Sequence, residues 1–96
     1  MNKKIVVFPQ VEAFIRALAP EPRRRLTQAI KALPAGQTKS MEGALAGYSL
    51  LRIGGFRVIY VDVVKKGVRT FEGIFAERRP IVYEMLEQIL TEEALE

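Results

Sequence analysis

Histidine, cysteine and tryptophan are all absent from this 96-residue chain. Without cysteine there can be no disulfide framework and no thiolate nucleophile, and without cysteine or histidine the usual zinc ligands are missing. The absence of histidine also removes the commonest general base and every triad that depends on it. Any catalysis must therefore use arginine, lysine, tyrosine or carboxylates, and we expect no zinc site.

Long apolar runs are missing as well. The run at residues 5–8 is typical, and it is far below the roughly 20 residues that a membrane helix requires. The N-terminus carries Lys3 and Lys4 but lacks a signal-like apolar block and a small-residue cleavage site. These features predict a cytoplasmic protein with no membrane partner.

The composition predicts one compact domain over residues 1–96, since the chain is 49% hydrophobic and 27% charged. Its net charge of +4 is unevenly distributed. Residues 80–96 hold five acids and no base, so residues 1–79 hold all 15 bases and the remaining six acids. A basic body suggests a polyanionic partner only weakly, because surplus surface lysine often serves solubility alone.

The hydrophobic pattern of the first half predicts a strand and two helices. Residues 4–8 are β-branched and aromatic, which is typical of a strand, and we expect it inside the sheet. Apolar residues at helical spacing predict helices over 11–19 and 21–33, divided by Pro20. Residues 34–47 contain three glycines and predict an irregular connection, long enough to be functional.

The clearest local signal is a hairpin between residues 48 and 63, where two apolar runs flank Gly54-Gly55. A turn at 65–67 and a strand over 68–76 complete a three-strand meander, and Pro80 opens a final helix. The expected fold class is α+β. It consists of a small antiparallel sheet, formed by the N-terminal strand and the meander, packed with two N-terminal helices and a C-terminal helix.

Basic residues converge at one end of this expected sheet. A two-residue loop sets Arg52 opposite Arg57 on one face, which is unfavourable unless an anion lies over the pair. Arg78 and Arg79 follow the last strand, and Tyr83 comes about one turn into the final helix. We predict a concave basic patch with a phenol at its edge, although spacing alone favours ordinary solvated side chains.

Other candidates are weaker. Arg23, Arg24 and Arg25 spread over different faces of a helix, which favours solvated residues over a binding site. Tyr48 and Tyr60 are expected to be half-buried in the sheet. Glu77, beside two arginines, is expected to be a local ion-pair partner, with a role as base the alternative.

A longer motif resembles the RelE/ParE superfamily of bacterial toxins, which are the toxin halves of type II toxin–antitoxin pairs. The resemblance covers most of the chain. It implies a small sheet backed by helices, no cofactor, and a partner antitoxin whose helix wraps and masks the toxin. The motif consists of Gly47-Tyr48, Leu51-Arg52-Ile53-Gly54-Gly55-Phe56-Arg57-Val58-Ile59-Tyr60, Arg78-Arg79 and Val82-Tyr83.

The RelE branch of that family implies a ribosome-dependent endoribonuclease that cuts messenger RNA. A ribose 2′-hydroxyl attacks the adjacent phosphate and leaves a 2′,3′-cyclic phosphate. By position, Arg57 matches the hairpin arginine, Arg52 the basic residue on the opposing strand, Arg79 the arginine ahead of the final helix and Tyr83 the family tyrosine; Arg78 would add a nucleic-acid contact. Guanidinium groups bind phosphate bidentately, and nearby positive charge favours a phenolate base.

The motif departs from the RelE pattern at two places. RelE-like nucleases commonly carry two basic residues on the strand before the turn, whereas this chain has Ser49, Leu50 and Leu51 and keeps only Arg52. One expected phosphate anchor is therefore missing. Arg78 stands where many members have histidine. The ParE branch shares the fold and inhibits DNA gyrase instead, so that alternative stays open, as does a detoxified member that only binds its antitoxin.

Overall fold

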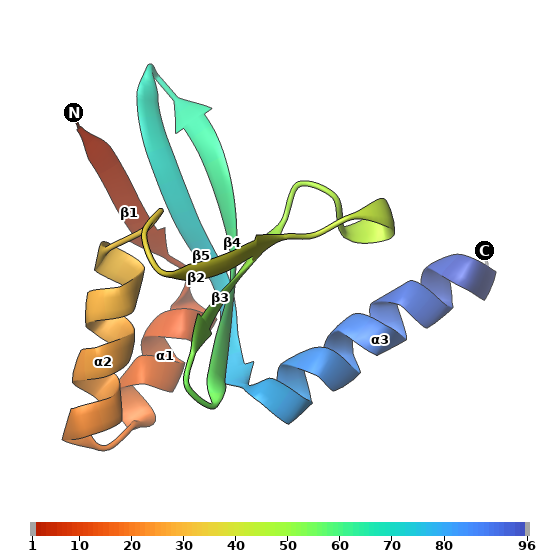
Figure 1. The fold of residues 1–96 in the computed structure, drawn as a ribbon, viewed down its shortest axis with the longest axis horizontal. Coiled ribbons are helices and arrows are strands. Elements are labelled where there is room, and N and C mark those ends of the chain that lie inside the picture. Colours follow the sequence, from red (N-terminus) through yellow and green to blue (C-terminus); the bar gives the residue numbers. More distant parts are fainter. Residues whose placement is uncertain (1, 96) are drawn as a thin grey trace.

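The computed structural model describes residues 2–95, with side chains through Thr91 (Figure 1). This part of the chain forms five strands, three α-helices and one short 3₁₀-helix. In chain order they are β1 (Lys3–Val7), α1 (Pro9–Ala17), α2 (Pro20–Lys31), β2 (Gln37–Ser40), η1 (Gly43–Leu45), β3 (Ser49–Ile53), β4 (Phe56–Lys65), β5 (Val68–Arg78) and α3 (Arg79–Leu95).

The strands form one sheet in the order β1-β5-β4-β3-β2. β1 pairs parallel to β5, and every other neighbouring pair is antiparallel. The α+β fold predicted from the sequence is confirmed, with the meander of β3, β4 and β5 at its centre. The sheet is mixed rather than wholly antiparallel, because the N-terminal strand pairs parallel to β5.

Two details of the prediction are wrong. β1 lies at the edge of the sheet rather than inside it. Its apolar side chains Ile5 and Val7 pack against the core on the face that α1 and α2 cover. This burial accounts for the apolar run, so β1 does not need a neighbouring strand on both sides. Residues 34–47 are not wholly irregular, since they contain η1 and the four-residue edge strand β2.

The sheet has a core on each face. In Figure 1, α1 and α2 lie together at one side of the sheet and α3 runs away from the other. The larger core joins α1 and α2 to the sheet through Val11, Leu26, Ile30, Leu33, Leu51, Ile53, Val58, Tyr60, Phe71 and Ala76. The smaller core joins α3 and η1 to the opposite face through Leu45, Leu50, Ile59, Val82 and Leu86.

Prolines set the starts of the first two helices. Pro9 and Pro20 each lie in the first turn of a helix, where the missing backbone N–H has no intrahelical partner to lose. α3 continues past the predicted apolar stripe to Leu95, so the backbone of the acidic end is helical and leads away from the sheet (Figure 1). None of the helices within residues 2–95 has the length and apolar character needed to cross a bilayer.

Phe71 is the largest fully buried side chain of the described residues. Its replacement by alanine is expected to lower the free energy of unfolding by about 3–5 kcal/mol, through lost burial and the cavity left behind. Thermal and urea unfolding measure this loss. Val64→Ala is the control, because Val64 is 71% exposed and its truncation should cost less than about 0.5 kcal/mol. Similar losses in the two variants would contradict the assigned core.

Candidate functional site

The β3–β4 hairpin sets the two central arginines side by side. Ile53 pairs with Phe56 and Arg52 with Arg57, as the two-residue loop predicts. In the turn, Gly54 has a φ of 54°, which a glycine adopts without strain and which is typical of a type II′ turn. Directly paired residues share a face of the sheet, so both guanidinium groups belong to the α3 face.

Arg57 is buried, with only 3% of its surface exposed. Its Nη1 donates hydrogen bonds of 2.8 Å to the carbonyl oxygens of Gly54 and Phe56, and its Nε donates to the Tyr83 hydroxyl at 3.4 Å. None of the ion pairs among the described residues involves Arg57. The turn therefore holds a fixed guanidinium that forms no ion pair with the described residues, which favours an anion beside it.

The start of α3 is tied to the same turn. The backbone N–H of Arg79 donates to the Gly55 carbonyl at 2.9 Å, and Val82 is fully buried on the α3 face of the sheet. These contacts hold Tyr83, 38% exposed, over the hairpin. The Arg79 guanidinium lies 4.7 Å from the centre of the Tyr83 ring, and that of Arg57 lies 5.7 Å from it.

The two arginines change the acidity of the phenol. Hydrogen bonding from Arg57 and then from Arg79, with their positive charges adding, lowers the pKa of Tyr83 below the ordinary 10.0. The partial burial of the ring opposes this shift and is the smaller effect. Tyr83 therefore gives up its proton at a lower pH than a free tyrosine, which suits a general base.

A hollow of about 240 Å³ connects this cluster to β2. Its lining contains three cationic side chains and a phenol, and none of the described residues that line it is acidic. The sequence does not reveal the contribution of β2, because a short polar strand has no hydrophobic pattern that would separate it from a loop. The hollow is lined by Gln37, Thr38, Lys39, Leu50, Arg52, Arg57 and Tyr83.

The structure thus brings together four of the five predicted site residues, Arg52, Arg57, Arg79 and Tyr83, and separates the fifth. Arg78 is the last residue of β5 and pairs with Phe56, which packs against the core on the opposite face. Since paired residues share a face, Arg78 points away from the hollow. Its inclusion in one patch with Arg57 was wrong.

Glu77 does not form the predicted ion pair. It pairs with Arg57 across β4 and β5, is half-buried, and its carboxylate accepts a 2.8 Å hydrogen bond from the Arg78 backbone N–H. None of the ion pairs in the described part of the chain includes it. Through this hydrogen bond Glu77 helps to hold the end of β5, where α3 begins.

The remaining candidates have structural surroundings. Arg23 donates to the Arg16 and Leu18 carbonyl oxygens, and Arg24 pairs with Glu21. Tyr60, at 5% exposed, is more deeply buried than expected, whereas Tyr48 is 39% exposed and lies just before β3 rather than in the sheet.

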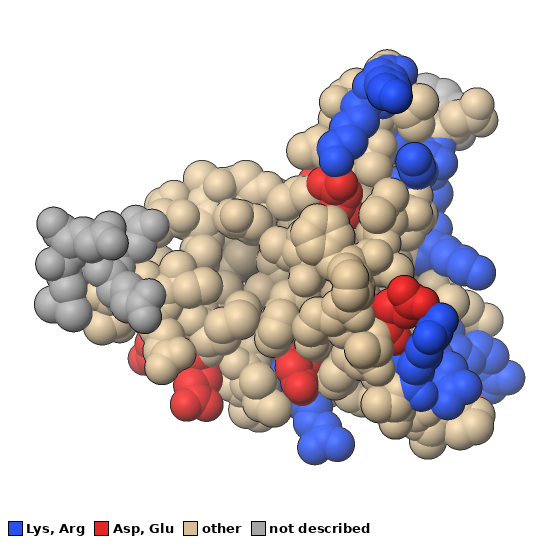
Figure 2. Space-filling view, turned by 180° about the vertical axis from the view of Figure 1, so that it is seen from behind, with Lys and Arg blue, Asp and Glu red and all other residues tan. Residues whose placement is uncertain are grey.

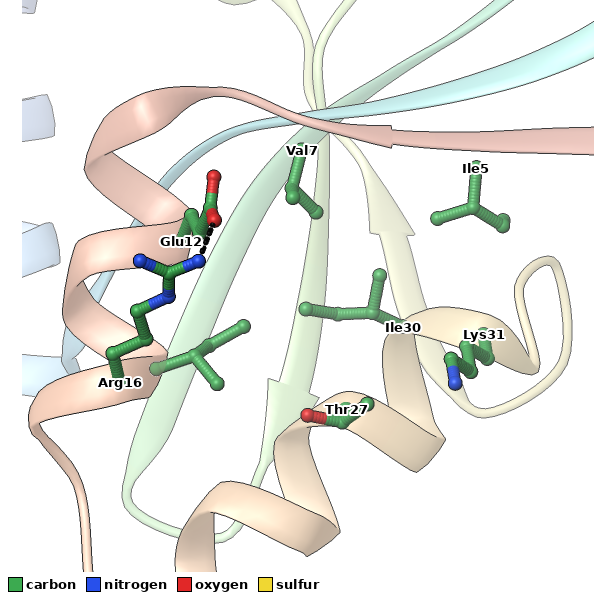
Figure 3. Close-up of a pocket in the computed structure, with 8 residues that line it drawn as sticks. Ile5, Val7, Glu12, Arg16, Thr27, Ile30 and Lys31 are labelled. Carbon is green, nitrogen blue, oxygen red and sulfur yellow. Dashed lines mark ion pairs between the residues drawn. The ribbon is translucent and has the colours of Figure 1, made fainter.

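Two hollows with mainly apolar linings lie outside this cluster. One, of about 350 Å³, lies between β1, α1 and α2, with Ile5, Val7 and Ile30 in its apolar lining and the Glu12–Arg16 ion pair beside it (Figure 3). The other, of about 310 Å³, is an apolar space between α3, η1 and the sheet. Neither contains a predicted site residue. Within the described residues, no acidic side chains are grouped as metal ligands.

Charge is unevenly distributed on the face that Figure 2 shows. Lysine and arginine side chains gather on the side of the molecule away from α3, with some acidic side chains among them, and other acidic side chains lie along the lower edge of α3. This agrees with the basic body and acidic end of the sequence.

Comparison with known proteins finds no matching protein-family model and no matching curated protein. Solved structures do match. A chain of the RelBE2 toxin–antitoxin complex from Mycobacterium tuberculosis superposes with a TM-score of 0.67 at 16% identity, over 82% of this chain and 100% of that one. A chain of the archaeal RelE–RelB complex from Pyrococcus horikoshii gives 0.63 at 20% identity, over 82% and 97%.

The YoeB/ParE toxin from Agrobacterium tumefaciens gives a TM-score of 0.55 at 22% identity, over 79% of this chain and 98% of that one. All three matches span nearly the whole length of the solved chain. The chain therefore has the fold found in RelE-type and YoeB/ParE toxin structures, as the sequence resemblance predicted.

Proposed function

We propose that this protein is the toxin of a type II toxin–antitoxin pair and cleaves messenger RNA on the ribosome in the cytoplasm. The observation that supports this is the cluster at the hairpin. Arg57, buried and without an ion pair among the described residues, lines a hollow that has no acidic lining, together with Arg52 and Tyr83. Arg79 lies against the Tyr83 ring, and both Arg57 and Arg79 lower the pKa of the Tyr83 hydroxyl. An RNA phosphate supplies the negative charge that this arrangement lacks.

The chemistry requires neither histidine nor metal. The Tyr83 phenolate takes the proton of a ribose 2′-hydroxyl, and the 2′-oxygen attacks the adjacent phosphorus. The guanidinium groups of Arg57 and Arg52 stabilise the charge that develops on the phosphorane oxygens. The bond from phosphorus to the 5′-oxygen breaks, and that oxygen takes a proton from water, leaving a 2′,3′-cyclic phosphate and a 5′-hydroxyl.

A cognate antitoxin is the expected protein partner, since two of the matching structures are complexes of toxin with antitoxin. Its gene should adjoin that of this chain, and its co-expression should relieve the growth arrest that the chain causes alone. Continued arrest with the neighbouring product present would contradict this partner assignment.

Primer extension on messages from cells that briefly express the chain tests the proposed activity. We expect cuts in phase with codons, and we expect Arg57→Gln and Tyr83→Phe to abolish them. Growth arrest with intact messages would refute the nuclease. Gyrase-dependent DNA damage in its place would favour the alternative that the sequence resemblance left open, a ParE-type inhibitor of DNA gyrase.

A further inference from the structure

β2 adds a cation to the hollow that the β3–β4 hairpin alone does not have. Within the ladder between β2 and β3, Lys39 pairs with Leu50 and Gln37 pairs with Arg52. Paired residues share a face. Lys39 therefore belongs to the same face as Arg52 and Arg57, and all three line the hollow.

The β3 position opposite Lys39 is apolar. β3 contributes two residues to this face, Leu50 and Arg52, and Leu50 is only 9% exposed because it packs in the smaller core. The strand that leads into the turn thus supplies a single cation to the hollow. Lys39, which lies directly across from Leu50 on the neighbouring strand β2, supplies a second cation.

Lys39 is also free of the structural contacts that occupy other lysines. Lys3 donates to the Lys31 and Leu33 carbonyl oxygens, and Lys65 pairs with Glu72. No hydrogen bond or ion pair among the described residues involves the exposed Lys39 ammonium. The three cationic side chains around this hollow repel one another, and an anion bound between them would offset that electrostatic repulsion.

We propose that Lys39 is a phosphate anchor of this site, which binds a backbone phosphate of the RNA strand from β2. The proposal rests on the proposed function for the identity of the anion. Lysine suits this task, because its ammonium is a point charge on a flexible stem, whereas the buried guanidinium of Arg57 is fixed beside Tyr83. Lys39 thus positions the strand, and Arg57 and Tyr83 act at the reacting phosphate.

The test compares Lys39→Gln with Lys39→Arg, and with Lys66→Gln as the matched control. Lys66 is exposed in the turn between β4 and β5, outside the hollow, and its replacement removes the same charge. Two quantities are measured: single-turnover cleavage on programmed ribosomes as a function of toxin concentration, and the salt dependence of binding to an uncleavable single-stranded 2′-O-methyl oligoribonucleotide.

For Lys39→Gln we expect the toxin concentration at half-maximal cleavage to rise about tenfold, because one charge-assisted contact with the RNA is lost. The slope of log affinity against log salt should fall by about 0.7, the value for one phosphate contact with a single strand. Lys39→Arg should restore both quantities, and Lys66→Gln should leave both at the native values.

The outcomes separate this proposal from the proposed function. A native chain that cleaves and binds, with Lys39→Gln equal to it in both measurements, would overturn the anchor and leave the nuclease standing. Equal losses in Lys39→Gln and Lys66→Gln would assign the effect to net charge and overturn it too. A native chain that binds the oligoribonucleotide through Lys39 but cuts nothing would retain the anchor and refute the nuclease. A native chain that does neither would refute both.

Discussion

Arg57→Gln is expected to reduce the rate of messenger cleavage by about 10²–10³-fold, the usual cost of removing one fixed donor from a developing oxyanion. The loss should fall on the rate at saturating toxin, because the guanidinium is already held by the Gly54 and Phe56 carbonyl oxygens before RNA binds. Single-turnover cleavage on programmed ribosomes measures it.

The control for this prediction is Arg16→Gln, which removes the same charge from an exposed side chain on α1 paired with Glu12. It should cleave at the native rate. Thermal unfolding checks that both variants fold. In Arg57→Gln the Gly54 and Phe56 carbonyl oxygens lose their donor, but they lie in the hairpin turn, where Gly54 is exposed and water can replace that donor. Native cleavage by Arg57→Gln would remove Arg57 from the reacting centre.

Tyr83→Phe should lower the cleavage rate by about 10²–10⁴-fold, the range for loss of a general base. The ring and its stacking with Arg79 remain, so only the hydroxyl is removed. Tyr48→Phe is the matched control, because Tyr48 is 39% exposed against 38% for Tyr83 and lies outside the hollow of the three cations. If both variants cleave at the native rate, the base is another group.

The dependence of the cleavage rate on pH tests whether the Tyr83 phenolate is the base. If the phenolate is the base, the rate rises with pH and levels off above the pKa of Tyr83, which Arg57 and Arg79 hold below 10.0. Arg79→Gln removes one of these two causes, so the pKa of Tyr83 rises and the plateau moves to higher pH. A profile that Arg79→Gln leaves unchanged, or a downward shift, would contradict the assignment.

The register of the β3–β4 hairpin could be predicted from local sequence. Two glycines between apolar runs allow only a short turn, and a two-residue turn sets every pair beyond it, so Arg52 opposite Arg57 followed from the sequence. The position of Tyr83 one turn into α3 followed in the same way from Pro80 and the apolar stripe of the helix.

The strands at the two edges were less predictable. The apolar run of β1 is compatible with an interior strand and with an edge strand whose one face is covered, and only its pairing with β5 distinguishes them. β2 has four exposed polar residues and exists because β3 offers it hydrogen-bonding partners. No pattern within residues 37–40 encodes that partner.

The sequence by itself determined the α+β class, the hairpin register, the absence of histidine and thiol chemistry, and a basic body that suits a polyanion. Only the tertiary structure decided which basic residues share a site. β5 extends through Arg78, so strand alternation turns that side chain to the far face, whereas Arg79 begins α3 and stacks on Tyr83. Pairing of β2 with β3 brings Lys39 to the same hollow. The physical reason is that the face of a strand residue changes with each single position, and the end of a strand is set by long-range pairing rather than by local preference.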